Sequence, residues 1–191
     1  MDRGTDAEHK CHLISGLSGT GKTTIGRLLA AALGYEFVDG DAFYRAEKPA
    51  VTLSSGVTVR NWDTEDAIDW ARMGAEVAAL LGRTGVILVT FLPRLDLMAG
   101  FPVASHVRLV YSAGDREDDI RRCALARRAT KGYRSPDAQA RDLLRVREVV
   151  YPAYERTCER FPGEATVLTY AGDARRPREE VLAETRRGLG L

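Results

Sequence analysis

The sequence predicts an α/β protein in which a parallel β-sheet lies between two layers of helices. Apolar strand-like runs alternate with longer helical patterns along the chain, which favours this class. Several of the runs are continuously apolar, as expected for strands covered on both faces. At 191 residues, 45% of them hydrophobic, the chain is long enough for one domain with a sizeable core. The expected fold is a three-layer α/β/α domain, residues 1–191, with a five-stranded parallel sheet.

Five strands and five helices are expected in alternation. The apolar runs predict strands over 11–15, 36–39, 86–91, 107–111 and 166–170. The helical patterns cover 22–33, 65–81, 115–128, 136–161 and 177–188. Gly34 is a signal for the end of a helix, and Thr64, Pro136 and Pro177 are typical of helix starts. Pro152 predicts a kink or a break within the fourth helix.

Charge and composition exclude several classes of partner. The 28 basic and 27 acidic residues nearly cancel, so no global field draws the chain to nucleic acid or to an anionic membrane. No apolar run reaches the roughly 18 residues that span a bilayer, and the N-terminal segment is too polar for a secretory signal. The 3 cysteines are widely spaced, which indicates neither a disulfide framework nor a zinc site. We therefore expect a soluble cytoplasmic protein, either a monomer or a homodimer.

The segment GLSGTGKTT, residues 16–24, fits the pattern G-x-x-x-x-G-K-[ST] and lies between a predicted strand and a predicted helix. Its glycines let successive backbone N–H groups point at a phosphate, and the following helix adds its positive dipole end. Lys22 is expected to reach the β- and γ-phosphates, and the hydroxyl of Thr23 to coordinate Mg²⁺. An ordinary glycine-rich turn is the alternative. The pattern predicts that ATP is held by Gly16, Ser18, Gly19, Thr20, Gly21, Lys22, Thr23 and Thr24.

The second predicted strand ends in two carboxylates, Asp39 and Asp41. Residues at i and i+2 of a strand point to the same side, here toward the crevice beyond the carboxyl ends of the parallel strands. Phosphoryl transfer needs a group that orients the attacking hydroxyl and accepts its proton, and Asp41 is the candidate. A carboxylate that only caps a turn is the alternative. Since the chain has no Asn-Lys-x-Asp tetrapeptide and is short for a motor or helicase, these features favour a kinase of small metabolites.

Three segments resemble the P-loop small-molecule kinases, especially their uridine kinase and ribosylnicotinamide kinase branch. They are DAFYR at 41–45, WDTEDAID at 62–69 and VYPAYE at 150–155. The resemblance implies the P-loop nucleoside triphosphate hydrolase fold. It also implies that Asp41 is the catalytic base and that Asp63 holds ribose hydroxyls.

Two departures from this branch indicate a second one. The third predicted strand, VILVTFL at 86–92, carries no carboxylate for magnesium, and the short connection at 81–85 leaves no room for a base-binding hairpin. The segment FVDGD at 37–41 resembles the gluconate kinases, which with the shikimate kinases place a D-x-D pair at the end of the second strand. This resemblance implies that Asp39 joins Thr23 in managing Mg²⁺ while Asp41 faces the acceptor.

From residue 121 to residue 134 the chain has six basic residues and no acidic one. A solvated helix face is one alternative, and nucleic-acid binding is another that the near-neutral net charge weakens. We expect a helical lid at about 121–138, the place that a lid occupies in the kinases named above. Its arginines would close over the transferring phosphoryl group and neutralise its charge. Arg127 and Arg128 are the expected catalytic groups of this lid, and Arg134 is an expected substrate contact.

Residues 46–61 form a polar stretch with little helical period. A loop this long inside a compact domain is usually functional, and we expect an acceptor-binding loop at about 42–64. The candidate donors and acceptors for a polyhydroxylated substrate are Tyr44, Arg45, Arg60 and Asp63. The two arginines leave open an acceptor that bears a carboxylate or a phosphate.

Together these features predict an ATP-dependent phosphotransferase that moves the γ-phosphoryl group to a hydroxyl of a small metabolite, with Mg²⁺ as cofactor. A nucleoside, a riboside or a related sugar-containing compound is the expected acceptor. A sugar-acid kinase of the gluconate or shikimate type is the alternative. A nucleotide-binding regulatory protein without an acceptor is the alternative from another class.

Overall fold

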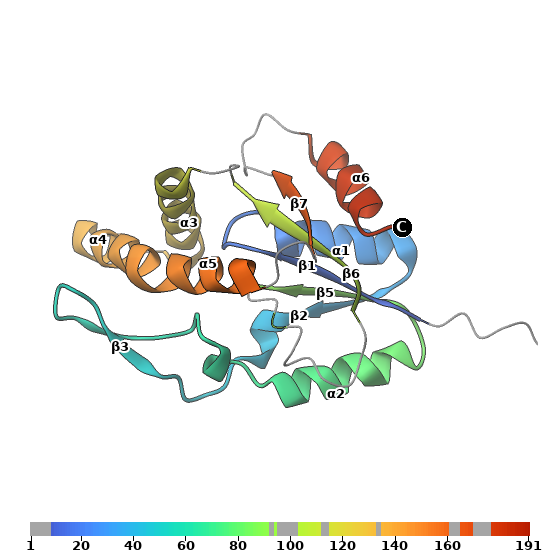
Figure 1. The fold of residues 1–191 in the computed structure, drawn as a ribbon, viewed down its shortest axis with the longest axis horizontal. Coiled ribbons are helices and arrows are strands. Elements are labelled where there is room, and N and C mark those ends of the chain that lie inside the picture. The colour runs from blue at the N-terminus through green and yellow to red at the C-terminus, as the bar shows by residue number, and fades with distance from the viewer. Residues whose placement is uncertain are drawn as a thin grey trace, which may run out of the picture.

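Five parallel strands form the central sheet of the computed structural model, which describes residues 9–91, 94, 103–111, 115–132, 135–160, 165–169 and 177–191 (Figure 1). The strand order is β2-β5-β1-β6-β7, and every neighbouring pair is parallel. The expected five-stranded parallel sheet is therefore confirmed. The strands are β1 (Cys11–Gly16), β2 (Glu36–Asp39), β5 (Val86–Thr90), β6 (Val103–Val110) and β7 (Thr166–Thr169).

Helices cover both faces of this sheet. Because side chains alternate along a strand, Leu13 and Ile14 of β1 face opposite layers. Leu13 belongs to the core cluster under α2, whereas Ile14 belongs to the cluster under α1 and α6. The helices are α1 (Lys22–Leu33), α2 (Trp70–Leu81), α3 (Arg116–Lys131), α4 (Pro136–Arg145), α5 (Tyr151–Arg160) and α6 (Arg178–Gly188). In the part of the chain that the structure describes, no helix is long and apolar enough to cross a membrane.

The second helix starts later than the sequence suggests. Residues Glu65–Ala67 form a separate 3-10 helix, and α2 begins only at Trp70. Thr64 makes no side-chain cap, whereas the carboxylate of Asp69 accepts a hydrogen bond from the backbone N–H of Arg72 at 3.1 Å. A carboxylate is a strong N-cap, so the helix starts after Asp69.

The segment expected as one long helix over 136–161 contains a wide turn. Residues Val146–Val150 are π-helical and join α4 to α5. The backbone N–H of Tyr151 bonds to the carbonyl oxygen of Val146, five residues earlier. Pro152 has no N–H and lies in the first turn of α5, so the disturbance expected at this proline lies just before it. Such π-helical turns occur often at functional sites.

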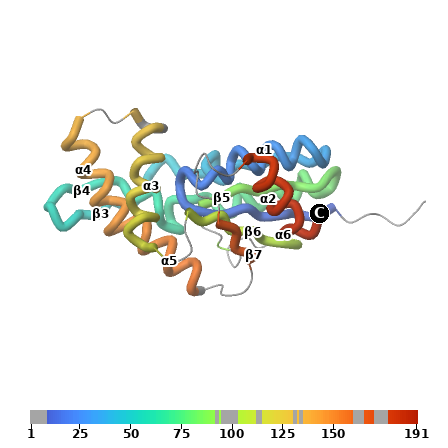
Figure 2. The backbone as a smooth tube through the Cα atoms, turned by 90° about the horizontal axis from the view of Figure 1, so that it is seen from above, coloured from blue at the N-terminus to red at the C-terminus, as the bar shows by residue number. Residues whose placement is uncertain are grey.

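A small hairpin stands where the sequence indicates a loop. It consists of the antiparallel strands β3 (Ala50–Thr52) and β4 (Thr58–Arg60). Ser54 in its turn donates hydrogen bonds to the carboxylate of Glu148 from its backbone N–H, at 2.9 Å, and from its hydroxyl. The hairpin is thereby tied to the π-helical turn. Figure 2 shows α3, α4 and the hairpin gathered at one end of the molecule, away from the C-terminus.

Candidate active site

The GLSGTGKTT segment forms a curled loop between β1 and α1. Gly19 has a φ of 88°, and a Cβ there would stand 2.1 Å from Cβ of Ala126 and 2.2 Å from the hydroxyl of Tyr111. Only glycine fits this close approach to α3. The hydroxyl of Tyr111 donates to the carbonyl of Ser18, and that of Thr20 donates to the carbonyl of Leu17 at 2.9 Å. The loop therefore holds its curled shape through its own contacts.

The N-terminus of α1 is open to an anion. Its N-cap is Gly21, with a left-handed φ of 85°, and neither a capping side chain nor an acidic residue lies in the first turn. The free backbone N–H groups and the positive end of the helix dipole are therefore available to a phosphate. Thr23 and Thr24 lie in this first turn, directly after Lys22.

The ammonium of Lys22 is affected by the charges of several other residues that the sequence singles out. In this structure its Nζ donates to the carbonyl of Leu17 at 3.4 Å. Burial lowers the pKa of this ammonium, while Asp41 and Asp39 act in the opposite direction and Arg127 adds to the lowering. These three side chains come from β2, the turn after it and α3. The fold thus brings together four of the residues singled out by the sequence.

The two carboxylates after β2 differ in their settings. Asp39 ends the strand, and its Oδ1 accepts a hydrogen bond from the backbone N–H of Asp41 at 3.1 Å. Asp41 is exposed at the start of the 3-10 helix Gly40–Phe43. A Cβ on Gly40 would stand 2.9 Å from the carbonyl oxygen of Val89, so glycine lets the turn lie against the end of β5.

Oxygen donors near the loop suit magnesium. Thr23 and Asp39 supply a hydroxyl and a carboxylate, the ligand types that a hard cation prefers. Among the described residues, no three His, Cys, Asp or Glu side chains form a cage that could hold a metal by itself. Mg²⁺ usually keeps several waters and takes further ligands from substrate phosphates. Two protein ligands are therefore compatible with its coordination.

Tyr44 follows the 3-10 helix that carries Asp41, and it is half-buried. Burial raises the pKa of its hydroxyl, and Asp41 and Asp63 raise it further. Its ring packs edge-on against Trp62, with the ring centroids 5.2 Å apart. Arg45 is exposed and donates from Nε to the carbonyl of Ile68 at 3.2 Å.

Four buried charged residues form a network beside Tyr44. Nη2 of Arg145 donates to Oδ2 of Asp63 at 2.9 Å, and Nη1 of Arg127 lies 3.9 Å from the other oxygen of Asp63. Nε of Arg127 donates to Oδ1 of Asp142 at 3.4 Å. Burial opposes the charge of Arg127, but Asp63 and Asp142 outweigh it and raise the pKa of this guanidinium. The network joins the acceptor-loop segment to α3 and α4.

The other predicted arginines lie outside this network. Arg128 is exposed and lines a small groove between α3 and α4. Arg60 is exposed at the end of β4. Arg134 lies outside the described residues.

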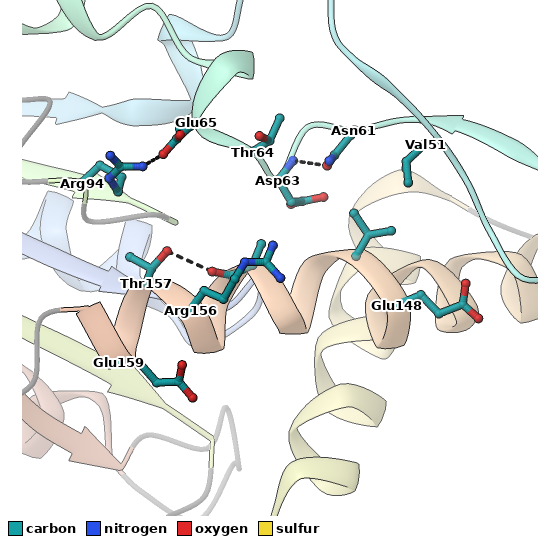
Figure 3. Close-up of a pocket in the computed structure, with 12 residues that line it drawn as sticks. Val51, Asn61, Asp63, Thr64, Glu65, Arg94, Glu148, Arg156, Thr157 and Glu159 are labelled. Atoms are coloured by element: carbon teal, nitrogen blue, oxygen red, sulfur yellow. Dashed lines mark hydrogen bonds and ion pairs between the residues drawn. The ribbon is translucent and has the colours of Figure 1, made fainter.

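A cavity of about 710 Å³ opens between the segment after β4 and the α5 helix (Figure 3). Asp63 lines it, so one residue belongs both to the cavity wall and to the charged network. Asn61 and Thr64 line the same side, and Thr157 and Arg156 lie on the α5 side (Figure 3). This volume lies within the range of about 300–1,000 Å³ common for small-molecule sites.

Three functional candidates carry no signal that sequence reasoning could use. Asp142 and Arg145 sit in a mixed charged stretch that reads as a solvated helix, and Arg145 meets Asp63 across 82 positions of the chain. Arg94, which is buried and paired with Glu65, follows a strand without any recognisable pattern. Residues that are so far apart in the sequence leave no periodic pattern when they make contact, so only the fold reveals the contact.

The fold and the candidate site suit a phosphoryl-transfer enzyme, and comparisons with known proteins identify the class. The family model described as shikimate kinase matches residues 18–51. A shikimate kinase from Thermobifida fusca (strain YX) is 30% identical over 160 residues, which cover 82% of this chain and 90% of that protein. The thermosensitive gluconokinase from Escherichia coli (strain K12) is 29% identical over 150 residues, covering 70% and 76%.

Two further comparisons are narrower in what they show. A probable gluconokinase from Mus musculus is 40% identical over 58 residues, so that match spans 30% of this chain and 29% of that protein. The crystal structure of a gluconokinase from Sinorhizobium meliloti 1021 aligns with a TM-score of 0.55 at 21% identity, covering 96% and 92% of the two chains, which supports the fold.

The chain belongs to the shikimate/gluconate kinase family of P-loop kinases. It is accordingly an ATP-dependent small-molecule kinase that works with Mg²⁺. The resemblance to the uridine kinase branch finds no support in these relatives, which are named after gluconate and shikimate.

Proposed function

We propose that this kinase transfers the γ-phosphoryl group of ATP to a hydroxyl of a polyhydroxylated carboxylic acid of the gluconate or shikimate type, called a sugar acid below. The observation that carries the transfer chemistry is the placement of Lys22 and Asp41 beyond the carboxyl ends of the parallel strands β1 and β2, at the same edge of the sheet, where the charge of Asp41 acts on Lys22. The names of the relatives support the acceptor class. The choice reverses the preference of the sequence, which placed a nucleoside or riboside first.

In the proposed mechanism, the loop and Asp41 act on the two sides of the reacting phosphorus. The amides of the loop and the ammonium of Lys22 bind the β- and γ-phosphates. Asp41 accepts the proton of the acceptor hydroxyl as its oxygen attacks the γ-phosphorus. The bond from that phosphorus to the β–γ bridging oxygen breaks, and ADP leaves. Asp41 is exposed in this structure and can therefore meet a substrate hydroxyl.

We assign the metal to Thr23 and Asp39. Bound there with the nucleotide, Mg²⁺ would supply charge neutralisation for the β- and γ-phosphates. Asp39 also fixes the turn that carries Asp41, through its hydrogen bond to the backbone N–H of Asp41. One carboxylate thus serves the metal while the next serves the acceptor.

We assign the stabilising guanidinium to Arg127. It is buried, and its charge acts on Lys22. Arg128 is exposed toward the groove between α3 and α4, which favours Arg127 over Arg128 as the group that neutralises developing charge. Arg134 remains a proposed substrate contact of the lid segment at about 121–138.

We place the acceptor between Asp41 and the cavity beside α5. Tyr44 and Asp63 are the proposed contacts along this path, because Tyr44 ends the 3-10 helix that carries Asp41 and packs against Trp62, the residue before Asp63. The carboxylate of a sugar acid can be bound by Arg45 or Arg60, the exposed arginines of the acceptor loop at about 42–64. A nucleoside is the second candidate, favoured by the aromatic pair of Tyr44 and Trp62, on which a base could stack in place of the Lys48 ammonium that lies 3.8 Å from the centroid of the Trp62 ring.

An acceptor panel tests this proposal. Purified protein with ATP and Mg²⁺ is offered gluconate, shikimate, other sugar acids, neutral sugars, nucleosides and ribosides, and ADP formation is measured together with the mass of the phosphorylated product. We expect a sugar acid to exceed every nucleoside by about a hundredfold or more in kcat/KM. A preference for nucleosides would restore the other branch. A flat profile without a phosphorylated product would leave a nucleotide-binding regulatory protein.

We further propose that residues 1–191 act as a single kinase domain, as a monomer or a homodimer in the cytoplasm. Near-neutral charge supports the expectation that neither nucleic acid nor a membrane is a partner.

A further inference from the structure

We propose that Asp142 is a positioning residue, whose carboxylate holds the guanidinium of Arg127 in the orientation that stabilises the transferring phosphoryl group. This inference rests on the proposed function, in which Arg127 neutralises charge during transfer. Asp142 itself lies on α4, beyond the predicted lid segment, and no motif in the sequence marks it.

Two carboxylates from different elements hold Arg127. Its Nε donates to Oδ1 of Asp142 at 3.4 Å, and its Nη1 lies 3.9 Å from Oδ1 of Asp63. Oδ2 of Asp63 is bound by Arg145 at 2.9 Å, so Asp63 is itself held by a second arginine. Among the residues that the structure describes, Asp142 gives Arg127 its only hydrogen bond.

One edge of the Arg127 guanidinium is left for another partner. Its Nη2 is buried and has no hydrogen-bond acceptor among the described residues. A buried N–H of a charged group is costly unless an acceptor reaches it. Arg127 follows Ala126, the residue of α3 that lies against Gly19 of the phosphate loop. The charge of Arg127 also acts on Lys22. The unpaired N–H therefore belongs to the surroundings of the phosphate site. A transferring phosphoryl group supplies the oxygen acceptors that this edge lacks.

The pair is buried enough for Asp142 to control orientation. The side chains of Arg127 and Asp142 are 7% and 5% exposed. Charges interact more strongly in such surroundings than in water. A planar guanidinium fixed at Nε cannot turn about its long axis without breaking that bond. Replacing the Asp142 carboxylate by the neutral amide of Asn weakens this bond, because a neutral oxygen is a weaker acceptor than a charged one. The plane of Arg127 is thereby loosened while the arginine stays present.

The test measures how much aluminium fluoride tightens the binding of Mg²⁺ and ADP, because this ion mimics the transferring phosphoryl group. In Asp142→Asn we expect the gain from aluminium fluoride to fall about tenfold, with the affinity for Mg²⁺ and ADP alone kept within about threefold. Asp142→Glu should recover part of the gain. Asp137→Asn, which removes an exposed carboxylate from the same helix, should behave like the wild type.

A double-mutant cycle separates positioning from a general effect. In an Arg127→Gln background, Asp142→Asn should lower the gain by less than about twofold, because the residue it positions is gone. An equal loss in both backgrounds would mean that Asp142 acts without Arg127. An undiminished gain in Asp142→Asn, or a matching loss of ADP affinity, would equally overturn the proposal.

A second comparison covers the case in which Asp142→Asn fails to fold because the charge of Arg127 is left uncompensated. Arg127→Gln is then compared with the Arg127→Gln, Asp142→Asn double variant, in which both charges are absent. Equal gains from aluminium fluoride in the two variants support the proposal, and a further loss in the double variant overturns it. A wild-type protein without any gain also overturns it.

The readout needs no acceptor, so the two proposals can fail separately. If the acceptor panel finds no substrate but the cycle shows coupling, the positioning role stands and the proposed function falls. If a sugar acid is phosphorylated but the cycle is additive, the proposed function stands and Asp142 has no positioning role.

Discussion

At the scale of single residues, Gly19 is a position where one added methyl group is costly. A Cβ there meets both Ala126 and the hydroxyl of Tyr111, in a backbone conformation that other residues rarely adopt. Gly19→Ala should therefore lower the free energy of unfolding by about 3 kcal/mol or more and abolish measurable ATP binding. Thermal unfolding and nucleotide titration check both effects.

Gly34→Ala is the matched control for Gly19→Ala. Gly34 also has a positive φ, of 68°, at the C-cap of α1, but a Cβ there meets no atom within 4 Å. This variant should lose only about 1 kcal/mol and bind ATP normally. Equal effects of the two substitutions would mean that the packing of the loop against α3 contributes nothing particular to stability or to ATP binding.

The residues of the site divide by how far their contacts reach along the chain. Lys22, Asp39 and Asp41 could be predicted because their spacing along two short segments carries the chemistry. Asp63 was expected to hold acceptor hydroxyls, and in the structure both its oxygens face arginines, which sequence patterns do not foresee. Arg145 belongs to the site only through the packing of α4 on the rest of the molecule.

At the scale of elements, two strands carry buried histidines that make stability depend on pH. His106 of β6 bonds through Nε2 to the hydroxyl of Ser15 in β1 at 2.7 Å. Burial lowers the pKa of His106 from 6.5 to about 4, and the positive charge of Arg108 contributes to this lowering. The unfolded chain therefore binds a proton more readily than the folded one between these two values.

Stability should accordingly fall as the pH drops from about 6.5 to about 4, by up to about 3 kcal/mol from this residue. His106→Gln should flatten that part of the curve in denaturant unfolding followed across pH. His9→Gln, which changes an exposed histidine, should leave the slope unchanged. A slope that is undiminished in His106→Gln would assign the effect to other groups, among them His12 of β1, whose pKa is also lowered by burial.

The sequence predicts an element well where burial of its side chains determines it. It predicts poorly where a helix cap or the pairing of very short strands determines it. β1 and β5 were expected because continuous apolar runs signal burial on both faces, and both are buried along their whole length. β7 is mostly exposed, and it was expected from the alternation of strand and helix patterns along the chain. The late start of α2 depends on which of two side chains, Thr64 or Asp69, caps the helix. The hairpin has three-residue strands without an apolar alternation strong enough to stand out, and its tie to Glu148 is distant in sequence.

At the scale of the whole molecule, the sheet order explains where the site lies. β1 lies between β5 and β6. After β1 the chain forms β2 at one edge of the sheet, then β5 between β2 and β1, and then crosses to β6 on the other side of β1. Ligands bind outside the carboxyl ends of the strands at such a change of direction. The phosphate loop after β1 and the Asp39–Asp41 turn after β2 both lie there. Alternating patterns predict a parallel sheet, but they do not determine this order.

Nucleotide and metal should stabilise the molecule together. Ligand at a hundred times its dissociation constant adds about 2.7 kcal/mol, which raises the Tm of a chain of this size by roughly 5–10 °C. We expect this shift from ATP with Mg²⁺, a smaller one when EDTA removes the metal, and almost none in Lys22→Ala. Differential scanning fluorimetry measures all three. An unchanged shift in Lys22→Ala would place the nucleotide elsewhere.

The most direct test of the account follows the γ-phosphoryl group itself in a single turnover. Wild-type protein and Asp41→Asn are each mixed with excess acceptor and limiting ATP labelled at the γ-phosphate. We expect label on the acceptor with the wild type. With Asp41→Asn, transfer should be slower by about a hundredfold or more while ATP binding stays within about threefold. Transfer at the wild-type rate in Asp41→Asn would contradict the assignment of the base and the geometry on which it depends.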